Sequence, residues 1–185
     1  MIDRGTVFFR RWRNVATLFL ASWFALGCAG YAGTDLLIGT SSTADVVASM
    51  GEPAMRWQEP DGSVQLAYPR GPEGMQTFMV FIAPDGRVRA IENVLTERHF
   101  AKIVPGATQD EVLRLIGPPA PQWTAYFAAR NELVWEWRYC DGGNITAKLD
   151  VLFDGTTKQV RTAYSRQDYR GKDGIAPACG HVPGR

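Results

Sequence analysis

Apolar residues recur at helical spacing in two stretches of the chain, and each stretch carries start and stop signals. In the second stretch, Val112, Leu115 and Ile116 fall at positions i, i+3 and i+4, which predicts one apolar helix face. Glu111 follows Thr108 by three residues, the spacing of a capping box. Gly117 and the prolines after it predict the helix end. A helix is therefore expected over 108–116.

The first stretch has the same signals in a weaker form. Ser42 is the expected N-cap, Val46 and Met50 supply a thinner apolar stripe, and Gly51 with Pro53 ends the helix. A third, short helix is expected over 95–103, with Thr96 as its N-cap and with a buried side formed by three apolar residues: Leu95, Phe100 and Ile103. His99 is expected to be half-exposed on that helix.

Downstream of each capped helix the period changes to two, which predicts strands. Trp135, Trp137 and Tyr139 alternate with a second set that we expect to face solvent: Val134, Glu136 and Arg138. Leu149, Val151 and Phe153 alternate in the same way, and the Asp154-Gly155 turn leads into a third strand over 159–164. In the first half, strands are expected over 64–68, 77–82 and 87–93, with a turn at Pro84-Asp85-Gly86.

These similarities predict an internal repeat. The segment 43–53 aligns with 109–119, Trp57 matches Trp123 at the same offset of 66 residues, and the strands follow in the same order at a larger offset, where Phe81 is matched with Phe153. The predicted fold is α+β, with two tandem units that each consist of a short helix or helix pair followed by a three-stranded antiparallel meander. The predicted divisions are a signal peptide over 1–27, a linker over 28–35, repeats over 36–94 and 95–166, and an irregular tail over 167–185.

The N-terminal segment has the layout of a secretory signal peptide. Arg10, Arg11 and Arg13 precede a short apolar run from Val15 to Leu26, which is shorter than the roughly 20 residues that span a bilayer. The run ends at Ala25-Leu26-Gly27-Cys28.

This ending resembles the lipobox of bacterial lipoproteins, which implies diacylation of Cys28. Because Ala29, and not Asp, follows the cysteine, the resemblance implies sorting to the outer membrane. Lipid anchoring through Cys28 is thus expected, with ordinary cleavage near Gly27 as the alternative.

The other two cysteines, Cys140 and Cys179, would be exported with the chain into an oxidising compartment. They either form a disulfide that ties the tail to the second repeat or remain free thiols.

Charge argues against nucleic acid as a partner. Residues 1–27 hold four of the 20 basic and one of the 19 acidic residues, so 16 basic and 18 acidic residues remain, a net charge of −2. The remaining basic residues also form no basic stripe of the kind that binds nucleic acid.

Residues for catalysis are also not grouped in the sequence. The two histidines, His99 and His181, have no partners at the spacing of metal ligands. No nucleophile and base stand together, and no cofactor motif is present, so the protein is expected not to be an enzyme and to need no metal or cofactor.

Aromatic residues are the candidates for partner binding: Trp57, Trp123 and Phe127. Burial in the core of each unit is the alternative for such residues. Strand alternation requires Trp135 and Trp137 to share a face, and the polar residues between them favour the core for that pair.

The order of helix, Gly-Pro ending, aromatic strand and hairpin resembles the SmpA/OmlA (BamE-like) family of outer-membrane lipoproteins. The resemblance covers about two-thirds of the chain and is carried best by the second half, in Leu95-Thr96, Ile103, Gly106, Thr108, Glu111-Val112, Ile116-Gly117, Pro119, Trp137, Tyr139, Leu149, Val151 and Phe153. It implies a periplasm-facing, lipid-anchored protein that helps to assemble or brace outer-membrane proteins by binding an envelope protein. Having two units departs from the family and puts a direct assembly role in doubt. Tandem units also look like the scaffold of secreted β-lactamase inhibitor proteins, so a periplasmic hydrolase inhibitor is the alternative function.

Overall fold

A computed structural model describes residues 32–70, 74–169 and 174–179. The predicted signal peptide and Cys28 lie outside the described residues. The fold is α+β, with two four-stranded antiparallel sheets, ordered β1-β2-β3-β4 and β5-β6-β7-β8. The elements are α2 (Thr43–Met50), β1 (Met55–Gln58), β2 (Val64–Arg70), β3 (Gln76–Ile82), β4 (Val88–Asn93), α3 (Glu97–Phe100), α4 (Gln109–Ile116), η1 (Pro121–Trp123), β5 (Thr124–Phe127), η2 (Ala128–Arg130), β6 (Glu132–Cys140), β7 (Thr146–Asp154) and β8 (Val160–Gln167).

Each sheet has one strand more than the three-stranded meander expected from the sequence. The additional strands, β1 and β5, are four residues long and lie at sheet edges. All four residues of β5 are exposed, so no alternation of buried and exposed positions marks this strand in the sequence. Its pairing with β6, in the register that joins Thr124 to Trp135, makes it a strand.

The two halves share their local construction. Both α2 and α4 begin with a complete capping box, at Ser42 and at Thr108, and both end at a glycine with positive φ, Gly51 or Gly117. Each N-cap residue also forms an isolated antiparallel bridge to the start of its sheet's last strand, Ser42 to Arg87 and Thr108 to Gln159. The capping box therefore fixes where each helix starts and also ties that start to its sheet.

The strand registers align the two sheets in detail. A bulge between Phe81 and Ile82 recurs between Leu152 and Phe153. Phe153 is therefore equivalent to Ile82, and matching it with Phe81 was wrong by one residue. Strand alternation explains the error, because Phe81 lies on the opposite face of its sheet from Ile82.

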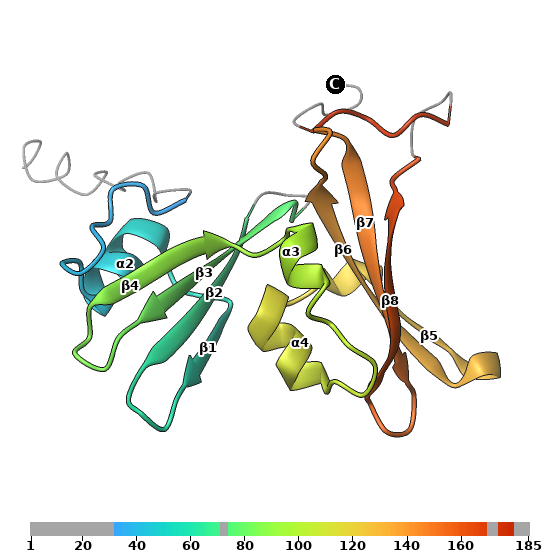
Figure 1. The fold of residues 1–185 in the computed structure, drawn as a ribbon, viewed down its shortest axis with the longest axis horizontal. Coiled ribbons are helices and arrows are strands. Elements are labelled where there is room, and N and C mark those ends of the chain that lie inside the picture. Colours follow the sequence, from blue (N-terminus) through green and yellow to red (C-terminus); the bar gives the residue numbers. More distant parts are fainter. Residues whose placement is uncertain (1–31, 71–73, 170–173, 180–185) are drawn as a thin grey trace, which may run out of the picture.

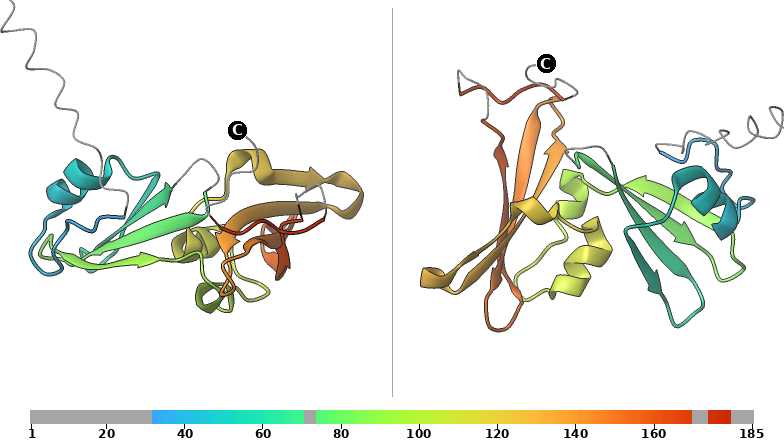
Figure 2. Two further views of the ribbon diagram at one scale, coloured as in Figure 1. Left: turned by 90° about the horizontal axis from the view of Figure 1, so that it is seen from above. Right: turned by 180° about the vertical axis from the view of Figure 1, so that it is seen from behind.

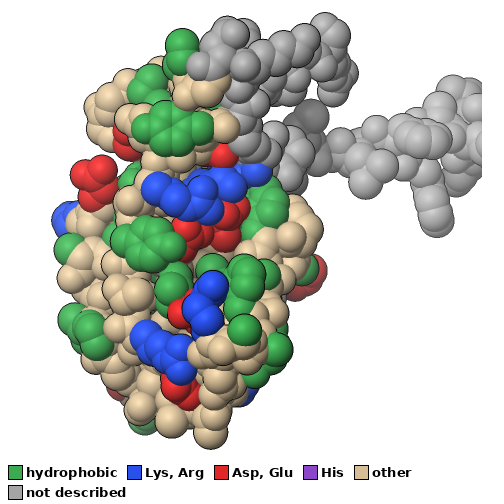
Figure 3. Space-filling view, turned by 90° about the vertical axis from the view of Figure 1, so that its right-hand side faces the viewer, with side chains coloured by type: hydrophobic (Ala, Val, Ile, Leu, Met, Phe, Trp, Pro, Cys, Tyr) green, Lys and Arg blue, Asp and Glu red, His purple; other side chains and the backbone are tan. Residues whose placement is uncertain are grey.

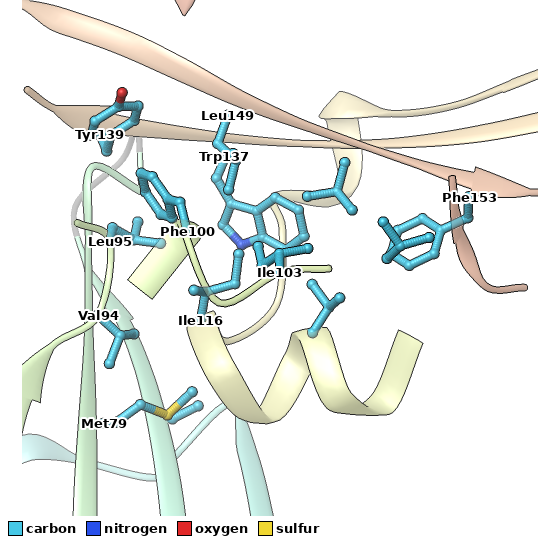
Figure 4. Close-up of a cluster of buried hydrophobic side chains, with 14 of the residues drawn as sticks. Met79, Val94, Leu95, Phe100, Ile103, Ile116, Trp137, Tyr139, Leu149 and Phe153 are labelled. Carbon is cyan, nitrogen blue, oxygen red and sulfur yellow. The ribbon is translucent and has the colours of Figure 1, made fainter. Parts of the chain in front are cut away.

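Helix α4 lies between the two sheets (Figures 1 and 2). One face of the first sheet packs on α2 through a cluster that includes Val46, Met50 and Leu66. The other face contributes Trp57, Ala67 and Met79 to a second cluster, which also holds Val112 and Ile116 of α4 and the inner face of the second sheet. The first sheet is therefore covered on both faces. Burial of the second cluster, which Figure 4 shows, joins the halves.

Polar contacts reinforce this junction between α4 and the first sheet. The Trp57 indole nitrogen donates to Asp110 over 3.2 Å, and Gln65 donates to the main-chain oxygen of Arg114. Arg114 forms ion pairs with Asp110 at 2.6 Å and with Glu59 of the first half. The hydrogen bond from Arg114 is the largest cause that holds the pKa of Asp110 below its usual value.

The helix expected over 95–103 is shorter than predicted, because α3 has only four residues. Leu95, Phe100 and Ile103 are buried as expected. His99 is buried as well, with 5% exposure, so the prediction of a half-exposed histidine was wrong. Its Nδ1 lies 2.8 Å from the Thr96 hydroxyl, so Thr96 contacts this ring and makes no side-chain bond to the helix main chain.

The segment just before the first repeat is packed rather than free. A Cβ on Gly33 would lie 2.9 Å from the sulfur of Met50, and Asp35 accepts a hydrogen bond from Ser49 over 2.7 Å. The described part of the predicted linker therefore lies against α2.

Candidate functional site

Among the described residues, no α-helix or strand covers one face of the second sheet, over which only the Trp123 ring of η1 folds back. Its inner face packs on α3 and α4, whereas its outer face is turned away from the rest of the molecule (Figures 1 and 2). We call this outer surface of β5–β8 the open face. Figure 3 looks onto this side of the molecule and shows Lys and Arg side chains next to Asp and Glu side chains, with apolar groups around them.

Charges on the open face are arranged in rows that cross the strands. Glu136 lies directly opposite Asp150, and Lys148 lies opposite both Arg138 and Arg166. Directly opposed residues therefore carry like charges, which by itself destabilises a sheet. Neighbouring rows carry opposite charges, so each side chain finds its partner on the diagonal.

The diagonal ion pairs are short. Lys148 Nζ lies 2.9 Å from Glu136 Oε1, Arg166 Nη2 lies 2.7 Å from Glu136 Oε2, and Arg166 Nε contacts Asp150 Oδ2. The hydrogen bond to Asp150 is the largest cause that raises the pKa of Arg166. These pairs order long side chains that would otherwise sample many rotamers.

Asp168 extends the network at the end of β8. Its carboxylate lies 3.4 Å from Arg138 Nε and 3.6 Å from Lys148 Nζ. The side chains of Arg138, Asp150 and Asp168 are only 5%, 5% and 2% exposed. Buried charges require partners, and this network of three acids and three bases is electrically balanced.

Aromatic side chains stand beside these charges. The Arg138 guanidinium lies 3.9 Å from the ring centroid of Trp123, and that of Arg130 lies 4.6 Å from the ring centroid of Phe127. The rings of Trp123, Phe127 and Tyr164 border a groove of about 460 Å³. Its charged lining includes Glu136, Lys148, Asp150 and Arg166. A groove with aromatic walls and paired charges offers stacking surface and hydrogen-bond donors and acceptors to a ligand.

A disulfide holds the C-terminal segment that follows β8. Cys140 at the end of β6 is bonded to Cys179, with their Cα atoms 5.9 Å apart. Next to it, Thr146 donates from its main chain and its side chain to the Pro177 oxygen, each over 2.8 Å. The tail is thus attached at the same end of the strands as Asp168, whose main-chain nitrogen donates to the Thr146 oxygen over 3.0 Å.

A second hollow of about 420 Å³ lies between the two halves and is mainly apolar. Its lining includes Pro118, Pro119, Pro121 and Met55. Trp123 and Arg138 line it too, and of this stacked pair Trp123 also lines the groove on the open face.

The structure separates the three aromatic residues that the sequence suggested for partner binding. Trp123 and Phe127 both line the groove on the open face. Trp57 is 7% exposed and packs under Arg114 at the junction of the halves, so its ring serves an internal contact. Trp137 is core, with 2% exposure, and Trp135 packs against the same cluster.

The expectation of an ordinary solvated face at Val134, Glu136 and Arg138 was wrong in one respect. Arg138 is 4% exposed, because Trp123 covers it and Asp168 pairs with it. The partners from β7 and β8 were missed altogether. Alternating charge in β6 and β7, at Glu136, Arg138, Lys148 and Asp150, was the available signal, and it acquires meaning only once the strand register is known.

Among residues 32–70, 74–169 and 174–179, no group of three or more His, Cys, Asp or Glu side chains could hold a metal ion. Within the same residues, no helix has the length and apolar character required to cross a membrane.

No protein-family model matches the chain, and neither does any curated protein sequence. A solved structure that it resembles is a crystal structure of an extracellular protein containing a SCP domain from Bacillus anthracis. That match has 10% sequence identity and a TM-score of 0.26, and it covers 72% of this chain and 45% of the other. The chain thus spans less than half the length of that protein, and a likeness this weak supports no inference about fold or function.

Proposed function

We propose that this protein is a cell-envelope adaptor that binds another protein through the open face of its second sheet. The observation that carries the proposal is the groove on this face, where Trp123, Phe127 and Tyr164 stand around ordered charge pairs. The face of the first sheet that is equivalent to the open face is buried under α4. Among the described residues, no such helix covers the open face of the second sheet.

The chemistry of the groove suits a polypeptide partner. Tryptophan, tyrosine and arginine dominate the energetics of protein interfaces, and all three line this groove as Trp123, Tyr164 and Arg166. Ion pairs already fix Arg166 and Lys148, so binding would cost less side-chain entropy than it would for free side chains. The balanced charge gives no attraction for a polyanion, which argues against nucleic acid.

Tandem duplication gives the architecture a rationale within this proposal. Shared capping boxes, helix-to-sheet bridges and bulges support descent of both halves from one BamE-like unit. The first unit then serves to bury α4, and the second unit presents the groove.

Anchoring to the outer membrane, facing the periplasm, completes the proposal and rests on the sequence alone, through the lipobox-like ending at Cys28. Attached acyl chains contribute about 0.8 kcal/mol per buried CH₂, so diacylation suffices for a stable anchor. Labelling cells with a fatty-acid analogue should mark the wild-type protein and not Cys28→Ser. A protein that stays unlabelled and is released with the soluble periplasm would contradict the anchor and leave the groove proposal standing.

The groove is tested by photo-crosslinking in intact cells. A crosslinking amino acid placed at Leu152, which lines the groove, should yield one discrete adduct with an envelope protein. The same amino acid at Tyr169, a 63% exposed position that does not line the groove, is the matched control.

Adding Phe127→Ala should reduce the adduct at Leu152 at least several-fold, because this ring forms one wall of the groove. Equal adduct patterns from Leu152 and Tyr169 would refute partner binding at the open face. Capture of a hydrolase whose activity is lost at 1:1 stoichiometry would instead support the inhibitor alternative.

A further inference from the structure

The four edge strands of the two sheets differ in how they are protected against pairing with another chain. Edge strands offer unpaired main-chain groups, and charged side chains are a common defence. Strand β1 carries Arg56, β4 carries Arg89 and Glu92, and β8 carries Arg161 and Arg166. Strand β5, with the sequence Thr124-Ala125-Tyr126-Phe127, has no charged residue and no proline.

The unprotected strand is also the most exposed of the four. All residues of β5 are exposed, including Tyr126 at 57% and Phe127 at 42%. A strand added at this edge would give both exposed rings cross-strand neighbours.

Strand β5 is held in place by its connection to β6 and the neighbouring turn. Asn131 accepts a hydrogen bond from the Tyr126 hydroxyl over 2.8 Å, and its main-chain oxygen accepts from the Gly155 nitrogen over 2.7 Å. Arg161 donates to the main-chain oxygen of Arg130 over 3.0 Å. The edge is therefore an ordered template, which lowers the entropic cost of adding a strand.

We propose that β5 pairs with β5 of a second copy of this chain, antiparallel and around a two-fold axis. In a two-fold pairing, the residue at the axis faces its own copy, and the other residues of the strand face each other across it. Such pairing is destabilised where it opposes side chains of like charge. Pairing of β8 with itself would bring arginines together, whereas β5 meets only neutral side chains. This difference in charge favours β5 over β8 as the edge that pairs with a second copy.

The register follows from strand alternation. Centring the axis at Tyr126 places the two Tyr126 rings opposite each other, and it places Ala125 of one protomer opposite Phe127 of its partner. Opposed residues then share a face, so the two sheets continue as one of eight strands. Ala125 and Phe127 line the groove, so the two grooves adjoin on one surface. The inference does not depend on the proposed adaptor function, because purified protein alone tests it.

Disulfide trapping is the decisive experiment, made on the full chain purified from the whole cell extract in mild detergent. Tyr126→Cys should form a covalent dimer under gentle oxidation, because opposed Cα atoms in such a ladder lie about 4.5–5.5 Å apart, within disulfide range. Tyr164→Cys is the matched control, a 48% exposed tyrosine of the edge strand β8 in the same sheet. Equal trapping at the two positions would overturn the proposal.

Sedimentation equilibrium gives a second, non-covalent readout. The wild-type protein should dimerise with rising concentration, and Tyr126→Lys should weaken dimerisation at least tenfold. Gln58→Lys adds the same charge to the edge strand β1 and should change nothing. Self-pairing would be refuted by a wild-type protein that stays monomeric throughout, or by a Tyr126→Cys variant that is trapped in cells with a different protein instead of its own copy.

Discussion

The two glycines that end α2 and α4 provide a matched test of how the halves are joined. Gly51 has φ 82° and ψ −171°, and Gly117 has φ 77° and ψ −178°, so their backbone conformations are nearly the same. Their surroundings differ. A Cβ on Gly51 would meet nothing within 4 Å, whereas a Cβ on Gly117 would lie 2.7 Å from Thr77 Cγ2 in the first sheet.

The expected magnitudes follow from these two conditions. Replacing glycine by alanine in this region of the backbone map costs on the order of 1–3 kcal/mol, and that cost should apply equally to Gly51→Ala and Gly117→Ala. At Gly117 the new methyl group also overlaps Thr77, which is 1% exposed and stiff at χ1 because it is β-branched. Overpacking of this kind adds about 1–3 kcal/mol.

Urea unfolding of the purified protein, followed by circular dichroism, measures both effects. We expect Gly51→Ala to lower the free energy of unfolding by about 2 kcal/mol and Gly117→Ala by about 3–5 kcal/mol. The difference between the variants isolates the contact between α4 and the first sheet. Equal losses would refute the packing of α4 on that sheet, because the backbone strain is common to both.

Two further predictions concern the tail and the buried histidine. Cys140→Ser removes a disulfide that links residues 39 positions apart, so the free energy of unfolding should fall by about 2–4 kcal/mol, and reducing agent should then have no added effect in urea titrations. Burial is the main cause that lowers the pKa of His99, with Lys102 and Arg98 adding to it. The neutral ring is thus favoured in the folded state, so stability should be complete above the ordinary histidine pKa of about 6.5 and decline as pH falls below it. Thermal unfolding between pH 7.5 and 5.5 should show this decline in the wild type and a smaller one in His99→Gln, and identical profiles would contradict the assignment.

Local signals in the sequence predicted α2 and α4 well, because the causes of these two helices are local. Thr108 and Glu111 form the capping box, and Gly117 ends α4 with positive φ, all within ten residues of one another. Strand β5 was missed for the opposite reason. Its four residues carry no alternating pattern, and only pairing with β6 defines it.

The charged face shows a second limit of sequence analysis. Alternation predicted that Glu136 and Arg138 share a face, and the structure agrees. Alternation cannot show which charges are opposed, because that depends on the register of β6, β7 and β8. The burial of Arg138 under Trp123 was equally inaccessible, since η1 brings that ring back over the sheet from outside the strand pattern.

Equivalent positions in the two sheets carry different side chains, and this difference restricts which kind of protein surface can bind to the open face. Ala67 lies opposite Met79, three residues from the first bulge, and these side chains surround Gly117 of α4. At the same distance from the second bulge, Glu136 lies opposite Asp150.

A helix with the apolar stripe of α4 would therefore meet charges where α4 meets Ala67 and Met79. Covering those ion pairs with apolar groups would remove water from the charges without replacing its hydrogen bonds, at a cost of several kcal/mol per ion. A further unit of the same kind thus cannot extend the array at this face. Any protein bound there must bring polar groups for Glu136, Lys148 and Arg166 and apolar groups for Trp123 and Phe127.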